Sequence, residues 1–318
     1  MVGHDLGLVV VAPRAGSRPP LDLDFIQGRH QRDAESVTTF TALSGTSFSR
    51  AGAGTAQRAD GTLASFATGA PRITDRGLLL EGSRTNRLLY SADLSAVNWS
   101  RTGTTATAGR VTATGSGNHI CFQSMSYTAG VDQAASVAFA KGNGFAFLQL
   151  CYSNPDRYKV TIDLATGAIS QGGIGSGTGS ASVADLGDRW MLTIVGQSAI
   201  GGGGYFNIGL ATALSGETYN VYAEPTFASS GQFVDVSYPQ LEVGASRSAP
   251  IATTGAAATR GADAAGAIAP AGVASWTATY GAANTVVGGL VTPGATFDLV
   301  AGRPWIGLGK ELKRLVMG

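Results

Sequence analysis

Hydrophobic and polar residues alternate along the middle of the chain, from Trp99 to about Glu242. In the segment "YKVTIDL" the apolar side chains share one face, namely Tyr158, Val160, Ile162 and Leu164. The polar side chains between them point the other way. A period of two residues is typical of a β-strand with one buried face. The segment "ATGAI" that follows predicts a turn, so the two strands around it should form an antiparallel hairpin.

The same alternation recurs in "DRWMLTIVG", where Trp190, Leu192 and Ile194 share a face. It continues in "QAASVAFAK", "GFAFLQLCY", "YFNIGLAT", "ETYNVYAEP" and "QFVDVSYPQLEV". Glycine-rich joints such as "GGIGSGTGS" separate these segments, and glycine tolerates the positive φ angles that tight reversals need. Many short strands with almost no helical segment predict an all-β fold, in the form of a jelly-roll β-sandwich.

The two ends of the chain show weaker patterns. Residues Met1 to Arg76 contain an apolar run at Leu6 to Pro13, interpreted as a strand or a buried arm, and small hairpins with "ADG" as a turn. Residues Ala249 to Gly272 are small and include proline, which is typical of an extended linker. A few strands are expected after it, and Lys310 to Leu315 is the one place where a short helical turn is expected.

These patterns predict four parts of the chain. Residues 1–87 form an irregular N-terminal arm for attachment, which wraps over another body, and residues 88–252 form the jelly roll. Residues 253–272 link the jelly roll to a small C-terminal β-module at residues 273–318.

The charge balance excludes one class of partner. The 318 residues include 22 Lys and Arg against 21 Asp and Glu, with no basic run that would neutralise a row of phosphates. We therefore expect no nucleic-acid binding. No window approaches the roughly 20 apolar residues of a membrane helix, so we expect no membrane insertion. The only cysteines, Cys121 and Cys151, are interpreted as two buried free thiols, with a single bridge as the alternative.

Residues suited to catalysis or metal binding are sparse. The nearest pair of carboxylates is Asp185 with Asp188, but "ADLGDRW" is interpreted as a solvated turn that opens a strand. The histidines lack the spacing of a zinc site, and they are His4, His30 and His119. Oxygen ligands for calcium are present without an EF-hand-like loop, at Asn154, Asp156 and Asp163. We expect no enzyme activity, no metal and no cofactor.

One segment combines the side chains that bind sugars. "CYSNPDRYK" brings aromatic, amide, carboxylate and guanidinium groups to a proline-containing hairpin tip: Tyr152, Asn154, Asp156, Arg157 and Tyr158. Aromatic faces stack on sugar C–H groups, and the polar groups bind hydroxyls or acidic sugars. The hypothesis is a glycan-binding site at this tip. The alternative is a plain turn, with Tyr158 directed into the core.

A second motif is "GLLLEGSRTNRLLYSADLSAVNW", from Gly77 to Trp99. Arg84 presents a rigid fork of donors that Glu81, Asn86 or Glu242 would accept. We interpret the motif as a structural clasp that fixes how the N-terminal part meets the jelly roll. Trp99 is assigned to core or clasp packing, with a sugar platform as the alternative.

The same motif resembles the "LLIEEARTNLLLYSEDF…W" segment of tail, fibre and head-spike proteins of tailed bacteriophages and of phage-derived gene transfer agents. Two further segments are similar to that family in the same order, "FSRAGAGTAQRADGTLASFATGAPRITDRG" and "VSYPQLEVGASRSAPIATTGAAATRGADAAG". The small β segment "ATYGAANTVVGGLVTPGATFDLVAGRPWIGLG" also resembles a tail found there. The resemblance spans roughly Thr46 to Leu308. It implies a central jelly roll similar to carbohydrate-binding modules.

The resemblance also implies a function and a location. The protein is expected on the surface of a virion, assembled in the bacterial cytoplasm, as a head-spike or tail-fibre subunit that attaches the particle to the host by binding capsular or other surface polysaccharide. Its expected partners are capsid or tail proteins, further spike or fibre subunits in a homo-oligomer, and the host polysaccharide. The main alternative is an adaptor or decoration protein that touches no sugar. A depolymerase is the third hypothesis, disfavoured because no internal repeat is present.

Overall fold

The computed structural model describes residues 19–318. The apolar run at Leu6 to Pro13, for which a strand or a buried arm is predicted, lies outside the described residues. The chain divides into two compact units. The central unit comprises Arg50–Arg72 and Glu81–Ala262, and the terminal unit comprises the described residues up to Ser49, Ile73–Leu80 and Asp263–Gly318.

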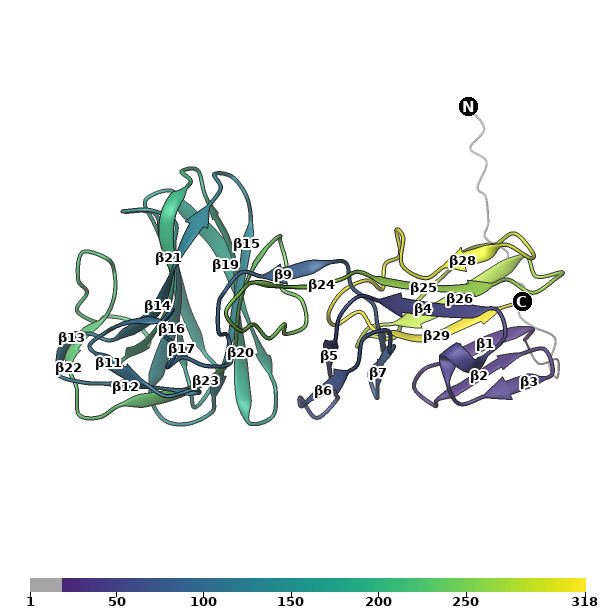
Figure 1. Ribbon diagram of the computed structural model, residues 1–318, viewed down its shortest axis with the longest axis horizontal. Helices are drawn as coiled ribbons and strands as arrows, with labels where there is room; N and C mark the ends of the chain where they lie inside the picture. Colours follow the sequence, from purple (N-terminus) through teal and green to yellow (C-terminus); the bar gives the residue numbers. More distant parts are fainter. Residues whose placement is uncertain (1–18) are drawn as a thin grey trace, which may run out of the picture. The chain divides into compact units, whose positions relative to one another are not determined.

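The prediction of an all-β fold is confirmed. Within residues 19–318 the only helical element is the short 3-10 helix η1 (Phe40–Ala42), and all other elements are strands (Figure 1). Among these residues there is accordingly no helix with the length and apolar character needed to cross a membrane.

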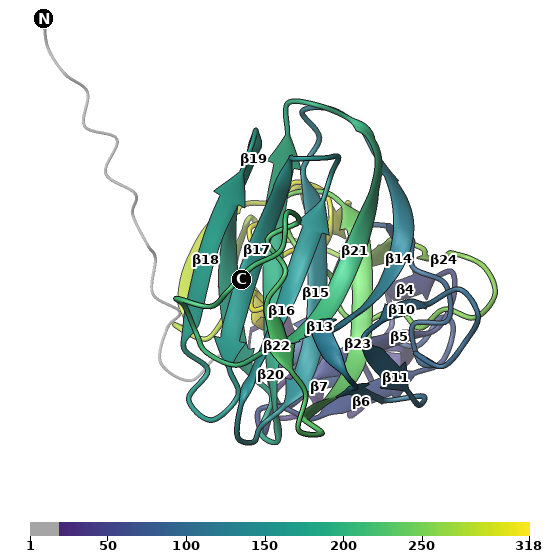
Figure 2. The same ribbon diagram turned by 90° about the vertical axis from the view of Figure 1, so that its left-hand side faces the viewer.

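The central unit is a sandwich of two antiparallel six-stranded sheets. The front sheet has the order β10 (Ser100–Thr102), β14 (Ile120–Tyr127), β21 (Gly202–Ala211), β16 (Phe145–Cys151), β17 (Arg157–Asp163) and β18 (Ile169–Ile174). The back sheet has the order β11 (Thr104–Ala106), β12 (Arg110–Ala113), β23 (Phe233–Val243), β15 (Gln133–Ala140), β20 (Arg189–Ser198) and β19 (Gly177–Asp185). Figure 2 shows strands of the front sheet side by side, in the layer nearer the viewer.

Apolar side chains between the two sheets form the core of the central unit. The front sheet contributes Leu148, Val160 and Phe206, and the back sheet contributes Leu192 and Ile194, each with no exposed surface. Burying a side chain of this size stabilises the fold by about 1.5–3 kcal/mol. The alternation predicted for "YKVTIDL" and "DRWMLTIVG" is confirmed, because Val160, Leu192 and Ile194 all face this core.

Three two-stranded sheets complete the central unit. They are β13 (Ser116–Asn118) with β22 (Thr226–Ala228), β24 (Ala258–Arg260) with β9 (Arg84–Asn86), and β5 (Gly54–Gln57) with β6 (Leu63–Phe66). The last pair confirms the hairpin predicted around "ADG", since Asp60 lies in its turn and accepts the backbone N–H of Thr62 at 2.9 Å.

The terminal unit contains an eight-stranded sheet and a three-stranded sheet. The larger sheet contains β27 (Thr285–Leu290), β26 (Ser275–Tyr280), β29 (Leu312–Met317), β1 (Leu21–Asp24), β2 (Arg29–Arg32) and β3 (Glu35–Val37) in this order, with β8 (Gly77–Leu79) and β7 (Arg72–Thr74) to the side. The smaller sheet has the order β28 (Thr296–Asp298), β25 (Asp263–Ile268) and β4 (Thr46–Arg50). A separate apolar core fills this unit, and it includes Leu23, Trp305 and Leu315.

The predicted division of the chain is therefore wrong at both ends. Strand β1 pairs with β29, with Leu21 opposite Met317, and Arg314 holds Asp22 through a 2.7 Å ion pair. The part of residues 1–87 that the structure describes is built of strands and is not an irregular arm. Residues 273–318 share one core with these strands, so they do not form a module of their own.

Three local predictions also fail. Residues 253–272 include strands β24 and β25 and are not only a linker. Lys310 to Leu315 leads into β29, because its apolar positions pack in the core of the terminal unit, and it forms no helical turn. The segment "ETYNVYAEP" is a loop whose one bridge joins Tyr219 and Pro225. Its alternation does not reflect a buried face, since Val221 is 85% exposed.

Candidate binding site

The outer face of the front sheet carries the polar side chains of its strands. On β17, Tyr158 and Val160 point into the core, so Arg157 and Lys159 lie on the opposite face. The register places Cys151 of β16 opposite Arg157, with Tyr205 of β21 next in the row. The adjacent row runs through Lys159, Gln149 and Asn207. Two rows of polar and aromatic side chains thus lie side by side on one surface.

The loop between β21 and β22, residues 212–225, lies across this face (Figure 2). Gln149 donates from Nε2 to the backbone oxygen of Tyr222 at 3.2 Å, and Asn207 donates from Nδ2 to Glu224 Oε1 at 3.2 Å. Side chains of the sheet therefore hold the loop directly. The loop turns an open sheet face into a walled pocket.

This sheet-face pocket has a volume of about 530 Å³. Its aromatic walls are Phe122, Tyr205 and Tyr222, and the two tyrosines are 42% and 46% exposed. Its polar lining is dominated by amides, one carboxylate and one guanidinium: Asn118, Asn154, Asn207, Asn220, Glu224 and Arg157. Exposed aromatic rings beside converging polar groups are the usual composition of a small-molecule or glycan site.

The carboxylate of Glu224 is held by three amides of the protein. It accepts hydrogen bonds from the amides of Asn118 at 2.7 Å, Asn207 at 3.2 Å and Asn220 at 2.8 Å. The residue itself is 5% exposed. These bonds fix the amides in position, so the role of Glu224 is to organise the pocket wall.

Arg157 is different, because its charge has no acidic partner in the described part of the chain. It is 1% exposed, and it donates from Nε to the Pro155 oxygen at 2.9 Å and from Nη2 to Asn154 Oδ1 at 3.1 Å. Both acceptors are neutral. Its Nη1 has no hydrogen-bond partner within residues 19–318, although it is shielded from solvent. Its guanidinium carbon lies 5.4 Å from the centre of the Tyr222 ring.

Asn207 supplies an unsatisfied acceptor in the same pocket. The residue is 2% exposed, and its amide nitrogen is bound by Gln149 Oε1 at 2.8 Å as well as by Glu224. Its Oδ1 is buried and accepts no hydrogen bond from the residues described. A buried polar atom without a partner costs about 1–3 kcal/mol. Two residues that line the pocket, Arg157 and Asn207, thus each carry a buried polar atom without a partner among the described residues.

Lys159 lies next to this pocket under the same loop. Its Nζ is 3.9 Å from the centre of the Tyr219 ring, and no described residue accepts a hydrogen bond from it. Burial lowers the pKa of Lys159 to about 8, although Glu217 and Glu224 oppose the shift. Burial therefore makes the charged form of the Lys159 side chain less favourable than it is in water.

Asp156 is a structural residue and not a ligand-binding one. It accepts hydrogen bonds from the Ser176 backbone at 2.7 Å, from the Ser176 hydroxyl at 2.9 Å and from Ser198 at 3.1 Å. These hydrogen bonds lower the pKa of Asp156, and the largest contribution comes from the backbone N–H of Ser176. Gly175 makes this approach possible, because a Cβ there would lie 2.1 Å from Asp156 Oδ1 and its φ is +64°. The carboxylate ties the end of β17 to the chain that leads into β19.

Two of the predicted sugar-stacking residues are in the core. Tyr152 is 1% exposed and packs edge-on against Tyr127, with ring centres 5.1 Å apart. Tyr158 is 6% exposed and donates its hydroxyl to Gln171 at 2.9 Å. Burial raises the pKa of both hydroxyls. The predicted platform is therefore wrong for both tyrosines, and the alternative of Tyr158 in the core is the one observed.

Of the predicted constellation, the pocket receives Asn154 and Arg157. The functional side chains that the sequence did not reveal are Tyr205, Asn207 and Tyr222. They come from β21 and from the loop, at least 48 residues away from Arg157 in the chain. No local pattern connects these segments, although the alternation in "YFNIGLAT" does place Tyr205 and Asn207 on the same face of a strand.

The buried ion-pair cluster at the predicted clasp is centred on Glu81 and not on Arg84. Glu81 binds Arg72 at 2.5 Å and Arg260 at 3.2 Å, and it accepts the backbone N–H of Ala249 at 3.0 Å. Arg84 makes none of these contacts. Its guanidinium lies beside Gly244, where a Cβ would sit 3.4 Å from it. The pairing of β9 with β24 brings Arg260 close to Glu81, which already binds Arg72.

Asn86 and Glu242 do not accept the guanidinium of Arg84 as predicted, and their hydrogen bonds go to other partners. Asn86 is fully buried and forms four hydrogen bonds, donating to the oxygens of Pro239 and Ile251 and accepting the backbone N–H groups of Leu88 and Leu241. Glu242 accepts both the backbone N–H and the hydroxyl of Ser248, at 2.8 and 2.6 Å. Trp99 is 1% exposed and packs on Phe206 in the sandwich core, so it is not a sugar platform.

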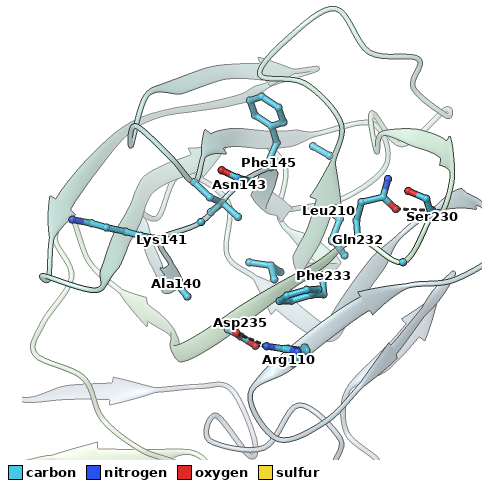
Figure 3. A pocket seen from close by; sticks show the side chains of 16 residues that line it. Arg110, Ala140, Lys141, Asn143, Phe145, Leu210, Ser230, Gln232, Phe233 and Asp235 are labelled. Atoms are coloured by element: carbon cyan, nitrogen blue, oxygen red, sulfur yellow. Dashed lines mark hydrogen bonds and ion pairs between the residues drawn. The ribbon is translucent and has the colours of Figure 1, made fainter.

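A second cavity, the end pocket of about 630 Å³, lies at one end of the sandwich. Figure 3 shows Arg110 and Asp235 directed toward one another at its rim, joined by bonds of 2.6 and 2.7 Å. Lys141 is paired with Asp185 at 2.7 Å, and Gln232 accepts the backbone N–H of Ser230 at 2.8 Å. The charged side chains Arg110, Asp235 and Lys141 that line this pocket are therefore paired within the protein, in contrast to Arg157 in the sheet-face pocket.

The remaining candidates for chemistry are explained by local structure. Asp185 and Asp188 flank the turn between β19 and β20, where Asp185 accepts the N–H of Gly187 at 2.8 Å. His4 lies outside the described residues, and burial lowers the pKa of His30. His119 contacts the oxygens of Gly103 and Phe227. Asp163 caps the turn after β17.

No cluster of three or more His, Cys, Asp or Glu residues suited to a metal occurs in residues 19–318. Cys121 and Cys151 are free and buried, which confirms their interpretation as thiols. Burial raises the pKa of Cys121 to about 12, so it is not a reactive thiolate.

Comparison of the sequence with protein-family models and with curated proteins gives no match. The resemblance to phage and gene transfer agent proteins therefore stays a prediction from the quoted motifs.

Proposed function

We propose that the protein binds a glycan in the sheet-face pocket. The observation that carries this proposal is the pair of buried, unsatisfied polar atoms, Arg157 Nη1 and Asn207 Oδ1, in a pocket walled by the half-exposed rings of Tyr205 and Tyr222. A sugar offers hydroxyls that both donate and accept, together with C–H faces that pack on aromatic rings. Both kinds of group are thus matched in one site.

We further propose that this binding attaches a virion to the surface polysaccharide of a bacterial host. Support comes from the resemblance of Gly77 to Trp99 and of the later motifs to head-spike and tail-fibre proteins. In this proposal the protein assembles with capsid or tail proteins and with further copies of itself. Many copies on one particle raise the effective concentration, which compensates for weak affinity at each site.

The test is a glycan array probed with the full-length protein, biotinylated and clustered on streptavidin. The wild type is expected to bind a subset of bacterial polysaccharides. Tyr222→Ala and Tyr205→Ala should each weaken binding about tenfold, because each removes an aromatic wall. Phe233→Ala is the matched control, since Phe233 is 50% exposed and lines the end pocket. It should bind as the wild type does.

Two results would contradict the proposal. Absence of binding to every glycan in the clustered format would favour the adaptor function, in which the protein contacts only other virion proteins. Binding that depends on Phe233 and not on Tyr205 or Tyr222 would move the site to the end pocket.

A further inference from the structure

We infer that the sheet-face pocket selects glycans that contain an acidic sugar, and that the guanidinium of Arg157 binds the sugar carboxylate. This inference rests on the proposed function, because it names the ligand class of the same site. Three features of the pocket support it: the uncompensated charge of Arg157, the binding of Glu224 by three neutral amides, and the fixed position of the guanidinium.

The charge of Arg157 is the first feature. The central unit also buries Arg72 and Arg260, each at no more than 2% exposure, and each of them has Glu81 as a counter-ion. A buried cation without a partner is costly, so buried arginines are normally paired. Arg157 has only the neutral oxygens of Pro155 and Asn154 within the described chain. An anionic ligand would supply the missing counter-ion.

Glu224, the carboxylate among the residues that line this pocket, does not fill that role. Three amide groups donate to its two oxygens, from Asn118, Asn207 and Asn220. Its two oxygens are thus held by neutral amides, and no ion pair joins it to Arg157 within the part of the chain that the structure describes.

The geometry of the donor is the third feature. The bonds from Nε and Nη2 hold the planar guanidinium in place, and its buried Nη1 has no hydrogen-bond partner within residues 19–318. A carboxylate accepts such a donor in its own plane. Asn207 Oδ1 then remains as the acceptor for a hydroxyl of the same sugar or its neighbour.

The experiment measures binding of the full-length protein to hexasaccharides of alginate, polygalacturonate and hyaluronan, each immobilised in native and in carboxyl-reduced form. The reduced form keeps the sugar and loses only the carboxylate. At least one native probe should bind at least about tenfold more tightly than its reduced counterpart, as expected when a charge-assisted hydrogen bond is lost. Raising the salt concentration should weaken binding to the native probe alone.

Variants identify the residue. Arg157→Gln should abolish the preference for the native probe while retaining weak binding to the reduced one. Asn207→Asp is the second variant, which keeps the side-chain shape and adds a negative charge, so it should weaken binding of the native probe more than of the reduced probe. Arg110→Gln is the control, because Arg110 is already paired with Asp235. A circular dichroism melt of each variant establishes that it is folded.

The outcomes separate this inference from the proposed function. Equal binding of native and reduced probes, still sensitive to Tyr222→Ala, would overturn the acidic ligand and leave glycan binding intact. Failure of every probe together with a silent glycan array would remove both. A preference for native probes that survives Arg157→Gln in a folded protein would also overturn the assignment to Arg157.

Discussion

Two regions of the central unit bury arginines, and they do so in opposite ways. At the clasp, Glu81 neutralises Arg72 and Arg260 within 2.5 and 3.2 Å. In the sheet-face pocket, Arg157 is equally buried but has only neutral acceptors among the described residues. The clasp arginines are neutralised by a carboxylate, and Arg157 has no acidic partner among the described residues.

The difference separates a structural role from a binding role. A compensated buried cluster is costly to break but contributes nothing to recognition, because all of its groups are occupied. A buried charge without a partner slightly lowers the stability of the free protein. A ligand that pairs with this charge removes the penalty, so its binding is strengthened. Substitutions in the two regions should therefore move different observables, namely the free energy of unfolding at the clasp and glycan affinity in the pocket.

The largest expected effect is at the clasp. Glu81→Gln leaves two buried guanidinium groups without their carboxylate, so the free energy of unfolding should fall by about 3–5 kcal/mol. Arg157→Gln, measured in the same way, should change it by no more than about 1 kcal/mol, because two ordinary hydrogen bonds are lost while a buried charge is removed. Urea denaturation followed by circular dichroism gives both values.

Similar losses for the two variants would break the comparison. In that case Arg157 would be a structural residue like Arg72, and its unpaired donor would not point to a ligand. Glycan binding of Glu81→Gln, measured below its unfolding transition, is the complementary control and should equal that of the wild type.

The second effect concerns Lys159, which borders the pocket and also lacks a counter-ion contact in residues 19–318. Its pKa is lowered from 10.5 to about 8 by burial. Below pH 8 the buried ammonium of Lys159 therefore lowers the free energy of unfolding. This destabilisation disappears as pH rises from 8 to about 10.5, because the folded protein loses the proton before the unfolded chain does. Lys159→Met should be more stable than the wild type by about 2 kcal/mol at pH 7, after allowance for partial exposure.

The sign of the pH dependence is the decisive part. The stability difference between Lys159→Met and the wild type should shrink when urea denaturation is repeated at pH 9.5. Lys141→Met is the matched control, since Lys141 is partly exposed and paired with Asp185. A stability difference between Lys159→Met and the wild type that is constant or grows between pH 7 and 9.5 would show that the buried ammonium does not destabilise the fold.

The fold of the central unit is largely predictable because its information is local. Alternation along "YKVTIDL" and the glycine-rich joints fix strands, turns and the buried face of each strand. The same logic already placed Tyr158 on the core face, and this conflicts with a stacking role for it. Where the alternation had no buried face behind it, in Glu217 to Pro225, the strand prediction failed.

The strand pairing of the terminal unit and the full set of pocket residues could not be predicted, because they depend on residues far apart in the sequence. Asp22 and Arg314 are paired across almost the entire chain, and no periodicity in either segment encodes its partner. In the site, Arg157 and Asn154 were found because they are neighbours in sequence. Tyr222 was not, because its position depends on how the loop after β21 is held by Gln149.

The smallest expected effect is in the end pocket. Asp235 and Arg110 form a bidentate pair, but their side chains are 34% and 45% exposed. Solvent screens such a pair, so Asp235→Asn should lower the free energy of unfolding by less than about 1 kcal/mol, and the loss should diminish at high salt. Glycan binding should not change. If Asp235→Asn instead weakens binding as strongly as Arg157→Gln does, the end pocket belongs to the recognition surface, and satisfied charges take part in binding after all.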